Sequence, residues 1–303
     1  MNLEHMLKQV LVSEDGFCRF MEPMSRHTTF RIGGPAKAYV CPGNEGELAG
    51  VIGLCRENGV PWRVLGNGSN LLVSDKGIEG VVIAMEGIWS RVTVDGTVIR
   101  AGAGALLSRA ARLALEHSLT GMEFAAGIPG SAGGALVMNA GAYGSEIKDI
   151  LGWAKVMTPE GEILELPAEK LELTYRSSCI PGRGYTVLEA AFELEPGSRE
   201  AIRARMKELA DRRKEKQPLE YPSAGSTFKR PQGYFAGKLI EEAGLRGYSL
   251  GGARVSEKHC GFVINGGDAT AGDVMDLCRH VRDKVRENSG VELELEIKPW
   301  GEF

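Results

Sequence analysis

Apolar residues recur at helical spacing in three long segments of the chain. Residues 44–58, 198–216 and 271–288 each place them three or four positions apart, which predicts one buried helix face in each. Gly59 follows the first segment and predicts its end, because glycine readily adopts the left-handed conformation that stops a helix. The second segment is highly charged, so we expect it to connect a last domain. The predicted buried face of the third is Val274, Leu277, Cys278, Val281 and Val285.

Three further helices are predicted over residues 1–20, 106–117 and 236–245. The stretch 101–109 imitates the first half of a dinucleotide-binding fingerprint, but Leu107 stands where its third glycine belongs. We therefore interpret this stretch as the start of an ordinary helix. Its predicted buried face is Leu106, Ala110, Leu113 and His117.

Runs of β-branched and other apolar residues predict strands between these helices. Asp95-Gly96 lies between two alternating runs, which is a strong signal for a β-hairpin over 91–100. A second strand, turn and strand is predicted over 153–166. The chain closes on a perfect alternation at 291–298, which predicts a strand with Val291, Leu293, Leu295 and Ile297 facing inward. Further strands are predicted at 38–40, 61–65, 71–75, 80–84 and 186–194.

Strands and helices are mixed along 303 residues, so the expected fold class is α+β with more than one domain. We predict one lobe over 1–88, a second over 89–200 and a last domain over 201–303. Apolar residues make up 43% of the chain and charged residues 25%, which is typical of a globular protein. The net charge of −4 gives no reason to expect a nucleic acid or an anionic membrane as partner.

Six cysteines occur without a Cys-x-x-Cys pair, which favours reduced thiols and a cytoplasmic location. The amino end lacks a basic stretch followed by an apolar run, and no span of about 20 apolar residues occurs, so neither export nor membrane crossing is predicted. The five histidines are scattered, and no metal site is predicted.

Two glycine-rich stretches carry the strongest sign of a binding site. Within the stretch 121–144, glycines at 127, 130, 133, 134, 141 and 144 are interleaved with Ala, Ser, Ile and Val, so few side chains cover the backbone of this largely apolar segment. Residues 66–70, Gly-Asn-Gly-Ser-Asn, form a second cluster of this kind after a predicted strand. Bare amides of this type bind anions such as phosphate, although tight turns would have a similar composition.

The sequence lacks the motifs of several common nucleotide-binding and hydrolase sites. The chain has neither a P-loop nor a complete Rossmann fingerprint. Neither Ser131 nor Ser226 lies in Gly-x-Ser-x-Gly, which argues against a serine hydrolase.

In order along the chain, six motifs resemble those of the UDP-N-acetylenolpyruvoylglucosamine reductase family, flavoenzymes of bacterial peptidoglycan precursor synthesis. They are the residues 28–34, 65–71, 127–134, 175–176, 225–229 and 293–298. The resemblance implies a vanillyl-alcohol oxidase-like fold, in which two lobes bind FAD and a third, C-terminal α+β domain binds the substrate.

The resemblance also implies the ligands and the reaction. FAD would be bound non-covalently, NADPH would reduce it and leave, and UDP-N-acetylglucosamine enolpyruvate would then be reduced to UDP-N-acetylmuramate. No obligatory protein partner is implied. The residues implied for FAD binding are Arg31, Gly66, Asn67, Gly68, Ser69, Asn70, Gly127, Ile128, Pro129, Gly130, Ser131, Gly133, Gly134 and Asn139.

Three residues match the family's catalytic positions. Arg176 and Glu296 would stabilise negative charge on the substrate carboxylate, and Ser226 would protonate carbon. The expected substrate-binding residues are Tyr175, Lys229 and Lys238.

The chain departs from parts of the family pattern. Ser177 stands where some members carry Asp, and we assign it no role. The tyrosine-bearing insertion of one branch is missing, which indicates the shorter branch and leaves Tyr234 only as a candidate for covering the substrate.

Two other functions stay open from the residues. The first is an FAD-dependent oxidase or dehydrogenase of a small alcohol or sugar on the same fold. The second is a non-enzymatic flavin- or nucleotide-binding module.

Overall fold

The computed structural model describes residues 3–303, which divide into two compact units. The first unit comprises residues 3–20, 38–67 and 80–212, and the second comprises 21–37, 68–79 and 213–303. Each unit has its own hydrophobic core. The division into domains at 88 and 200 stays a prediction.

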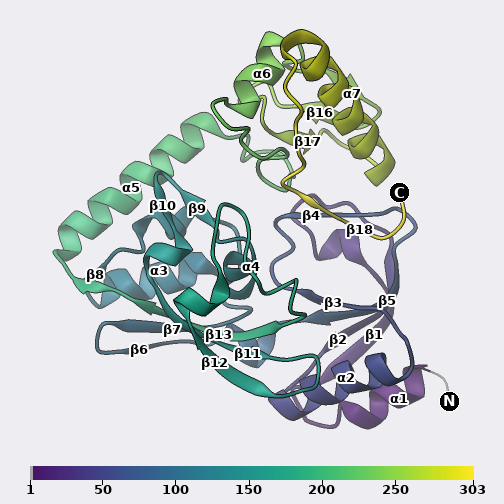
Figure 1. The fold of residues 1–303 in the computed structure, drawn as a ribbon, viewed down its shortest axis with the longest axis vertical. Coiled ribbons are helices and arrows are strands. Elements are labelled where there is room, and N and C mark those ends of the chain that lie inside the picture. The colour runs from purple at the N-terminus through teal and green to yellow at the C-terminus, as the bar shows by residue number, and fades with distance from the viewer. Residues whose placement is uncertain (1–2) are drawn as a thin grey trace. The chain divides into compact units, whose positions relative to one another are not determined.

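The first sheet has the strand order β1-β2-β5-β3. Two helices, α1 and α2, lie on one of its faces (Figure 1), where Leu7 and Leu48 are fully buried in the core of the first unit. The bounds are α1 Leu3–Val10, β1 Phe17–Pro23, β2 Pro35–Cys41, α2 Glu45–Glu57, β3 Trp62–Leu65 and β5 Ile78–Ala84.

The predicted helix 44–58 is confirmed with its start and end. The Asn44 side chain accepts a hydrogen bond from the Glu47 amide at 2.9 Å, and Gly59 has φ +63° just after the helix. The predicted helix over 1–20 is wrong beyond Val10, and its residues 1–2 lie outside the described chain. There the backbone turns to meet the Glu47 carboxylate, which accepts the amides of Val12 and Ser13.

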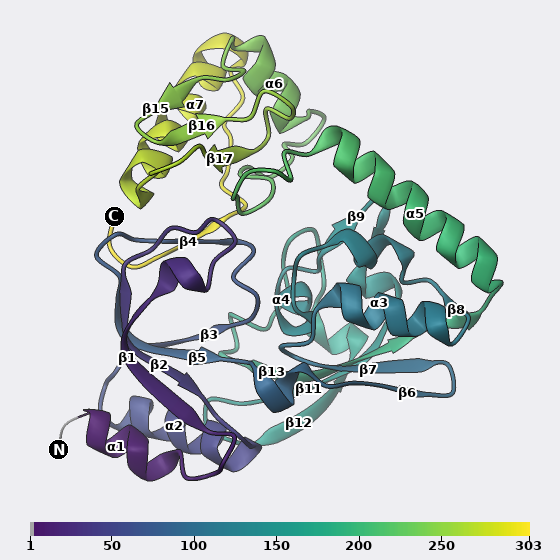
Figure 2. The same cartoon turned by 180° about the vertical axis from the view of Figure 1, so that it is seen from behind.

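The second sheet is antiparallel and has the order β12-β11-β13-β7-β6. Its β6–β7 pair confirms the predicted hairpin, with Gly96 at φ +57° in the turn. Helices α3 and α4 cover one face of the sheet (Figures 1 and 2). The bounds are β6 Val92–Asp95, β7 Val98–Gly102, α3 Leu107–Glu116, α4 Ala132–Val137, β11 Leu151–Met157, β12 Ile163–Pro167 and β13 Thr186–Glu193.

The buried face predicted for α3 is confirmed only in part. Leu106 is 41% exposed because the helix begins one residue later, after Leu106 has paired with Ser131 in a β-bridge. Of the other predicted residues, Ala110 is buried as expected, Leu113 is half-buried and His117 is exposed. The remaining buried residues of the helix are Leu107, Ala111 and Ala114. The alanines allow the helix to approach the sheet closely.

The charged helix α5, Arg199–Lys216, confirms the helix predicted over 198–216, and its apolar residues Ile202 and Leu209 are buried while Met206 is half-buried. Short strand pairs complete the first unit: β8 Leu119–Thr120 with β14 Glu195–Pro196, and β9 Gly141–Ala142 with β10 Ser145–Glu146. Single 3-10 turns occur at Met24–Arg26, Gly87–Ser90, Glu123–Gly127, Ile147–Asp149 and Ala168–Leu171.

In the second unit, α6 and α7 pack together beside a three-stranded sheet of order β15-β16-β17 (Figure 2, green to yellow). A capping box between Thr270 and Asp273 starts α7, and Gly290 at φ +71° ends it. The predicted buried face of α7 is confirmed in full. The bounds are α6 Ala236–Glu242, β15 Ser249–Leu250, β16 Ala253–Val255, β17 Val263–Asn265 and α7 Ala271–Ser289.

The closing strand predicted over 291–298 is mostly wrong. Regular pairing begins only at β18, Lys298–Trp300, which runs parallel to β4, Leu71–Val73. The preceding residues lie against an irregular loop, where the Glu296 amide donates to Thr227 O at 2.8 Å. The side chains still alternate, since Leu293 and Ile297 are each 1% exposed.

None of the helices within residues 3–303 has the length and apolar character needed to cross a membrane. The cysteines are free thiols, four buried and two half-buried.

Candidate active site

The glycine loop 66–70 connects β3 to β4 and presents its backbone amides. No amide of residues 66–70 donates to an acceptor in the described part of the chain. Gly68 has φ +60°, and a Cβ atom there would lie 2.0 Å from His27 O, so only glycine fits. These free donors can bind an anion such as a pyrophosphate. The boundary between the units falls after Asn67, so each half of the loop belongs to its own unit.

Within the first unit, the beginning of this loop contacts the second glycine stretch. The Asn67 side-chain amide donates to Pro129 O at 2.6 Å. A Cβ atom at Gly66 would lie 2.1 Å from Ser131 Oγ. Gly66 and Asn67 therefore lie beside the second glycine stretch, which is about 60 residues away in sequence.

The stretch 127–134 is part loop and part helix. Ser131 caps the start of α4, and its side chain accepts from the Gly134 amide at 3.4 Å. The amide of Gly133 donates to Ala103 O at 2.8 Å, and this residue is buried. Gly133 therefore serves close packing, whereas Gly127, Ile128, Pro129 and Gly130 lie at least partly at the surface.

Tyr175 and Arg176 occupy the tip of a tight turn in the first unit. Thr174 and Ser177 exchange backbone hydrogen bonds of 3.0 and 3.1 Å below them. Arg176 has φ +53°, and its guanidinium lies 5.1 Å from the centre of the Tyr175 ring. Its Nη2 donates to Gly141 O at 3.3 Å, so the guanidinium is held beside this turn.

Asn139, predicted to bind the cofactor, is fully buried. Its Nδ2 donates to Glu146 Oε2 at 2.8 Å and to Thr174 O at 3.1 Å. Its Oδ1 accepts from the Lys148 amide at 2.9 Å. Both of its side-chain donors are thus used by protein, and its oxygen is bonded to protein as well.

In the second unit, Ser226 and Glu296 lie on neighbouring segments. Thr227 follows Ser226 in the chain, and its backbone amide donates a hydrogen bond to Gly261 O at 2.8 Å. Its carbonyl oxygen accepts a hydrogen bond from the Glu296 amide, also at 2.8 Å. The end of the glycine loop joins them, because Asn70 Nδ2 donates to Glu296 O at 3.1 Å. Glu296 is half-buried, whereas Glu292 and Glu294 are exposed, so the structure distinguishes Glu296 from the two other glutamates of this segment, which the sequence alone does not.

Arg31 also belongs to the second unit and is exposed, at φ +56°. The backbone around it is fixed by two buried polar side chains: Thr28 donates to Ile32 O at 3.0 Å, and Asn265 to Phe30 O at 3.2 Å. Thr28 lies in the motif 28–34, whereas Asn265 was not predicted, because its partner Phe30 is 235 residues away in sequence.

The predicted substrate lysines form ion pairs. Lys229 Nζ lies 2.9 Å from Glu294 Oε2, and its hydrogen bond and charge lower the pKa of the Glu294 carboxyl. Lys238, on α6, lies 3.6 Å from Glu242.

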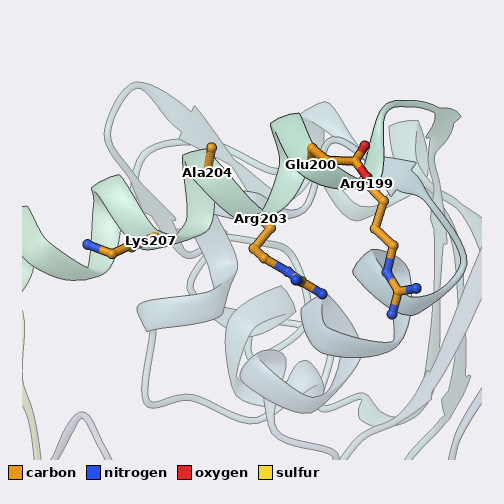
Figure 3. Close-up of a pocket in the computed structure, with 5 residues that line it drawn as sticks. All are labelled: Arg199, Glu200, Arg203, Ala204 and Lys207. Atoms are coloured by element: carbon orange, nitrogen blue, oxygen red, sulfur yellow. The ribbon is translucent and has the colours of Figure 1, made fainter.

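One surface pocket lies along α5 and is basic. Figure 3 shows Arg199 and Arg203 extending from the same side of the helix, with Glu200, Ala204 and Lys207 completing the lining. An adjoining pocket includes Gly127 together with Tyr143, whose hydroxyl donates to Leu209 O at 3.2 Å. The predicted catalytic residues line neither pocket.

The described contacts thus form two groups of predicted residues. Gly66, Asn67 and the stretch 127–134 meet in the first unit, which also holds Tyr175 and Arg176. Asn70, Glu296 and the segment that carries Ser226 meet in the second unit, through Thr227 and the Asn70 side chain.

Two family models match the chain. One, described as an FAD binding domain, matches residues 36–167, which contain both glycine stretches. The other, described as UDP-N-acetylenolpyruvoylglucosamine reductase, C-terminal domain, matches residues 217–300, which contain Ser226 and Glu296.

Relatives match over nearly the whole chain. A UDP-N-acetylenolpyruvoylglucosamine reductase of Lachnoclostridium phytofermentans is 55% identical, covering 98% of this chain and 96% of its own. The protein of the same name from Caldanaerobacter subterraneus is 53% identical, covering 98% and 97%.

Solved structures agree on the fold. The Thermus caldophilus UDP-N-acetylenolpyruvylglucosamine reductase superposes with a TM-score of 0.81 at 36% identity, covering 94% of this chain and 99% of its own. A berberine bridge enzyme variant matches with a TM-score of 0.50 at 18% identity, covering 65% and 44%, which is a likeness of fold alone. The predicted α+β FAD-binding fold with a C-terminal domain is confirmed.

Proposed function

The chain belongs to the UDP-N-acetylenolpyruvoylglucosamine reductase family, and we propose that it reduces UDP-N-acetylglucosamine enolpyruvate to UDP-N-acetylmuramate, with FAD as cofactor and NADPH as hydride donor. The structural observation that carries this proposal is the run of unpaired amides at 66–70, within the segment that matches an FAD binding domain. An oxidase or dehydrogenase of a small alcohol or sugar is not favoured, because the berberine bridge enzyme shares only the fold.

FAD fits the residues present. The amides of 66–70 offer donors for its pyrophosphate, and the absence of Cβ atoms at Gly66 and Gly68 lets the loop lie close to Ser131 and to His27. Gly127, Ile128, Pro129 and Gly130 add surface beside the loop. When bound, FAD supplies the hydride that reduces the substrate double bond.

Arg176, Ser226 and Glu296 are assigned to the substrate's side of the reaction. Hydride addition to the terminal carbon of the enolpyruvyl group pushes negative charge toward the carboxylate. In our proposal the Arg176 guanidinium binds that carboxylate, and protonated Glu296 donates a hydrogen bond to it. Ser226 Oγ–H gives its proton to the carbon that bears the carboxylate, which completes the lactyl ether.

The remaining assignments concern binding and location. Tyr175, which is 50% exposed, and the two lysines Lys229 and Lys238 are proposed to bind the sugar nucleotide. Free thiols at all the cysteines support a cytoplasmic location, where reduced thiols persist.

The test follows the flavin absorbance of the purified protein under anaerobic conditions. We expect NADPH to bleach the flavin band and the enolpyruvyl sugar nucleotide to restore it, with UDP-N-acetylmuramate as product. Rapid reoxidation by oxygen, without any by the sugar nucleotide, would favour an oxidase. A protein that stays colourless after FAD is added would contradict any flavoenzyme.

A further inference from the structure

We propose that Asn139 is a positioning residue that fixes the turn carrying Tyr175 and Arg176, rather than a ligand of the cofactor. This inference rests on the proposed function, because it concerns the arginine assigned to the substrate carboxylate.

The side-chain amide of Asn139 is bonded to protein at every donor and at its oxygen, so it has no hydrogen left to donate to a ligand. It is fully buried, and both Nδ2 hydrogens are used, one by Glu146 Oε2 and the other by Thr174 O. The Lys148 amide occupies Oδ1 at 2.9 Å. The partners come from β10, the turn after it and the 174–177 turn, so Asn139 joins its own neighbourhood to a turn 35 residues further along the chain.

Along the backbone, Asn139 follows the glycine stretch 127–134, and its side chain contacts the 174–177 turn. Helix α4 starts at its cap Ser131, in the glycine stretch, and the Asn139 amide donates to Leu136 O at 3.2 Å as the helix ends. Asn139 has φ +38°, a left-handed conformation that asparagine tolerates better than most residues. Helix α4 therefore has the glycine stretch 127–134 at its start and Asn139, which binds the 174–177 turn, just after its end.

The segment 139–141 contacts both the backbone of the 174–177 turn and the guanidinium of Arg176. Thr174 O accepts the Asn139 amide and the Ser177 amide, each at 3.1 Å, and this fixes the base of the turn. Two residues after Asn139, Gly141 O accepts Arg176 Nη2 at 3.3 Å. Without the Asn139 side-chain amide, the 174–177 turn would lose this anchor. The Arg176 guanidinium would then no longer be held in one orientation.

The predicted consequence is confined to one half of the catalytic cycle. A displacement of about 1 Å can cost about 100-fold in rate when a group must meet its substrate in one orientation. Reduction of the substrate needs Arg176, whereas FAD binding and reduction by NADPH do not depend on the turn in the proposed mechanism.

The experiment replaces Asn139 by glycine, which removes the amide and accepts φ +38° without strain. We expect FAD content and the rate of flavin reduction by NADPH to stay within about twofold, and reoxidation by the enolpyruvyl sugar nucleotide to slow about 10- to 100-fold. In an Arg176→Ala background, Asn139→Gly should cause no further slowing. Asn139→Asp, which keeps the acceptor for Lys148 and removes the donors, should give the same pattern.

The matched control is Ser178→Ala. Ser178 Oγ donates to Val137 O at 2.9 Å, so this change also removes a link between the turn segment and the end of α4, but leaves Thr174 O untouched. Ser178→Ala should reoxidise within about threefold of the wild-type rate.

Three results would overturn the inference: loss of FAD, equal slowing of both half-reactions, or a further loss in the Arg176→Ala background. Slowing by Ser178→Ala as large as that by Asn139→Gly would also overturn it, since general loosening would then explain both. Failure of the proposed function is distinguishable, because wild-type protein would then not be reoxidised by the sugar nucleotide at all.

Discussion

The hydroxyl oxygen of Ser131 occupies the space that a side chain on Gly66 would enter, 2.1 Å from the position of its Cβ. Each residue lies in one of the two glycine-rich motifs. Glycine at position 66 is therefore required by the protein's own packing, as well as by any ligand that binds the exposed amides beside it.

This relationship predicts that the effect of Gly66→Ala depends on Ser131. Forcing a methyl group against the hydroxyl should lower the free energy of unfolding by about 1–3 kcal/mol and weaken FAD binding. Ser131→Ala alone should cost about 1 kcal/mol through the lost helix cap. Urea unfolding and FAD titration measure the two effects.

The double variant decides the cause. With the hydroxyl gone, the nearest Ser131 atom to the new methyl group is Cβ at 3.2 Å, so Gly66→Ala should cost less in the Ser131→Ala background. Strictly additive losses would mean that the methyl group acts on something other than Ser131.

A second prediction compares two glycines with nearly equal backbone conformations. Gly68 at φ +60° would place a Cβ atom 2.0 Å from His27 O, whereas Gly96 at φ +57° has no atom within 4 Å of that position. Gly96→Ala should cost about 1 kcal/mol of stability, the ordinary cost of a left-handed alanine. Gly68→Ala should cost clearly more and reduce FAD content, because the loop must move away from a backbone carbonyl. Similar stability losses and full flavin content in both variants would contradict this interpretation.

Local sequence signals predicted the elements that local forces decide. The hairpin at Asp95-Gly96 and the helix from Asn44 to Gly59 carry their own turn and cap residues, and both are confirmed. The prediction of a closing strand over 291–298 was wrong because alternating apolar residues indicate which side chains are buried, but not which segment the backbone bonds to. Here that segment is the irregular loop at Thr227.

The candidate site shows the same division between local and distant causes. Bare glycine backbone identified both loops, because it is visible in a short window of sequence. The role of Asn139 could not be predicted from the sequence, because its contacts with Glu146 and Thr174 form only in the folded structure.

A third prediction concerns Ser226. Ser226→Ala should leave flavin reduction by NADPH nearly unchanged and slow reoxidation by the enolpyruvyl substrate about 100- to 10,000-fold, the range expected when a general acid is lost. Ser223→Ala, in the same loop, is the matched control and should retain both half-reactions. Stopped-flow absorbance measures them separately. Equal loss of both half-reactions in Ser226→Ala would argue against its role as proton donor.

A fourth prediction concerns stability and pH at Glu47, which is only 5% exposed. Burial alone would raise the pKa of its carboxyl, but hydrogen bonds from Gly43, Ser13 and Val12 outweigh burial and lower it. A carboxyl whose pKa is lowered by folding stabilises the protein above its unfolded pKa of about 4.3 and loses that contribution as pH falls through the folded value. Glu47→Gln should therefore cost about 2–4 kcal/mol near pH 7, because an amide NH₂ would face backbone donors.

The difference in unfolding free energy between wild type and Glu47→Gln should shrink as the pH falls below about 4, where the wild-type carboxylate itself takes up a proton. Glu57→Gln, at the exposed end of α2, is the matched control and should change stability by less than about 0.5 kcal/mol at either pH. Urea unfolding at pH 7 and at several values between 5 and 3 measures both variants. A loss for Glu47→Gln that stays constant over this range would show that the carboxylate charge does not stabilise the contact, and that the shape of the side chain alone supports the backbone at Val12 and Ser13.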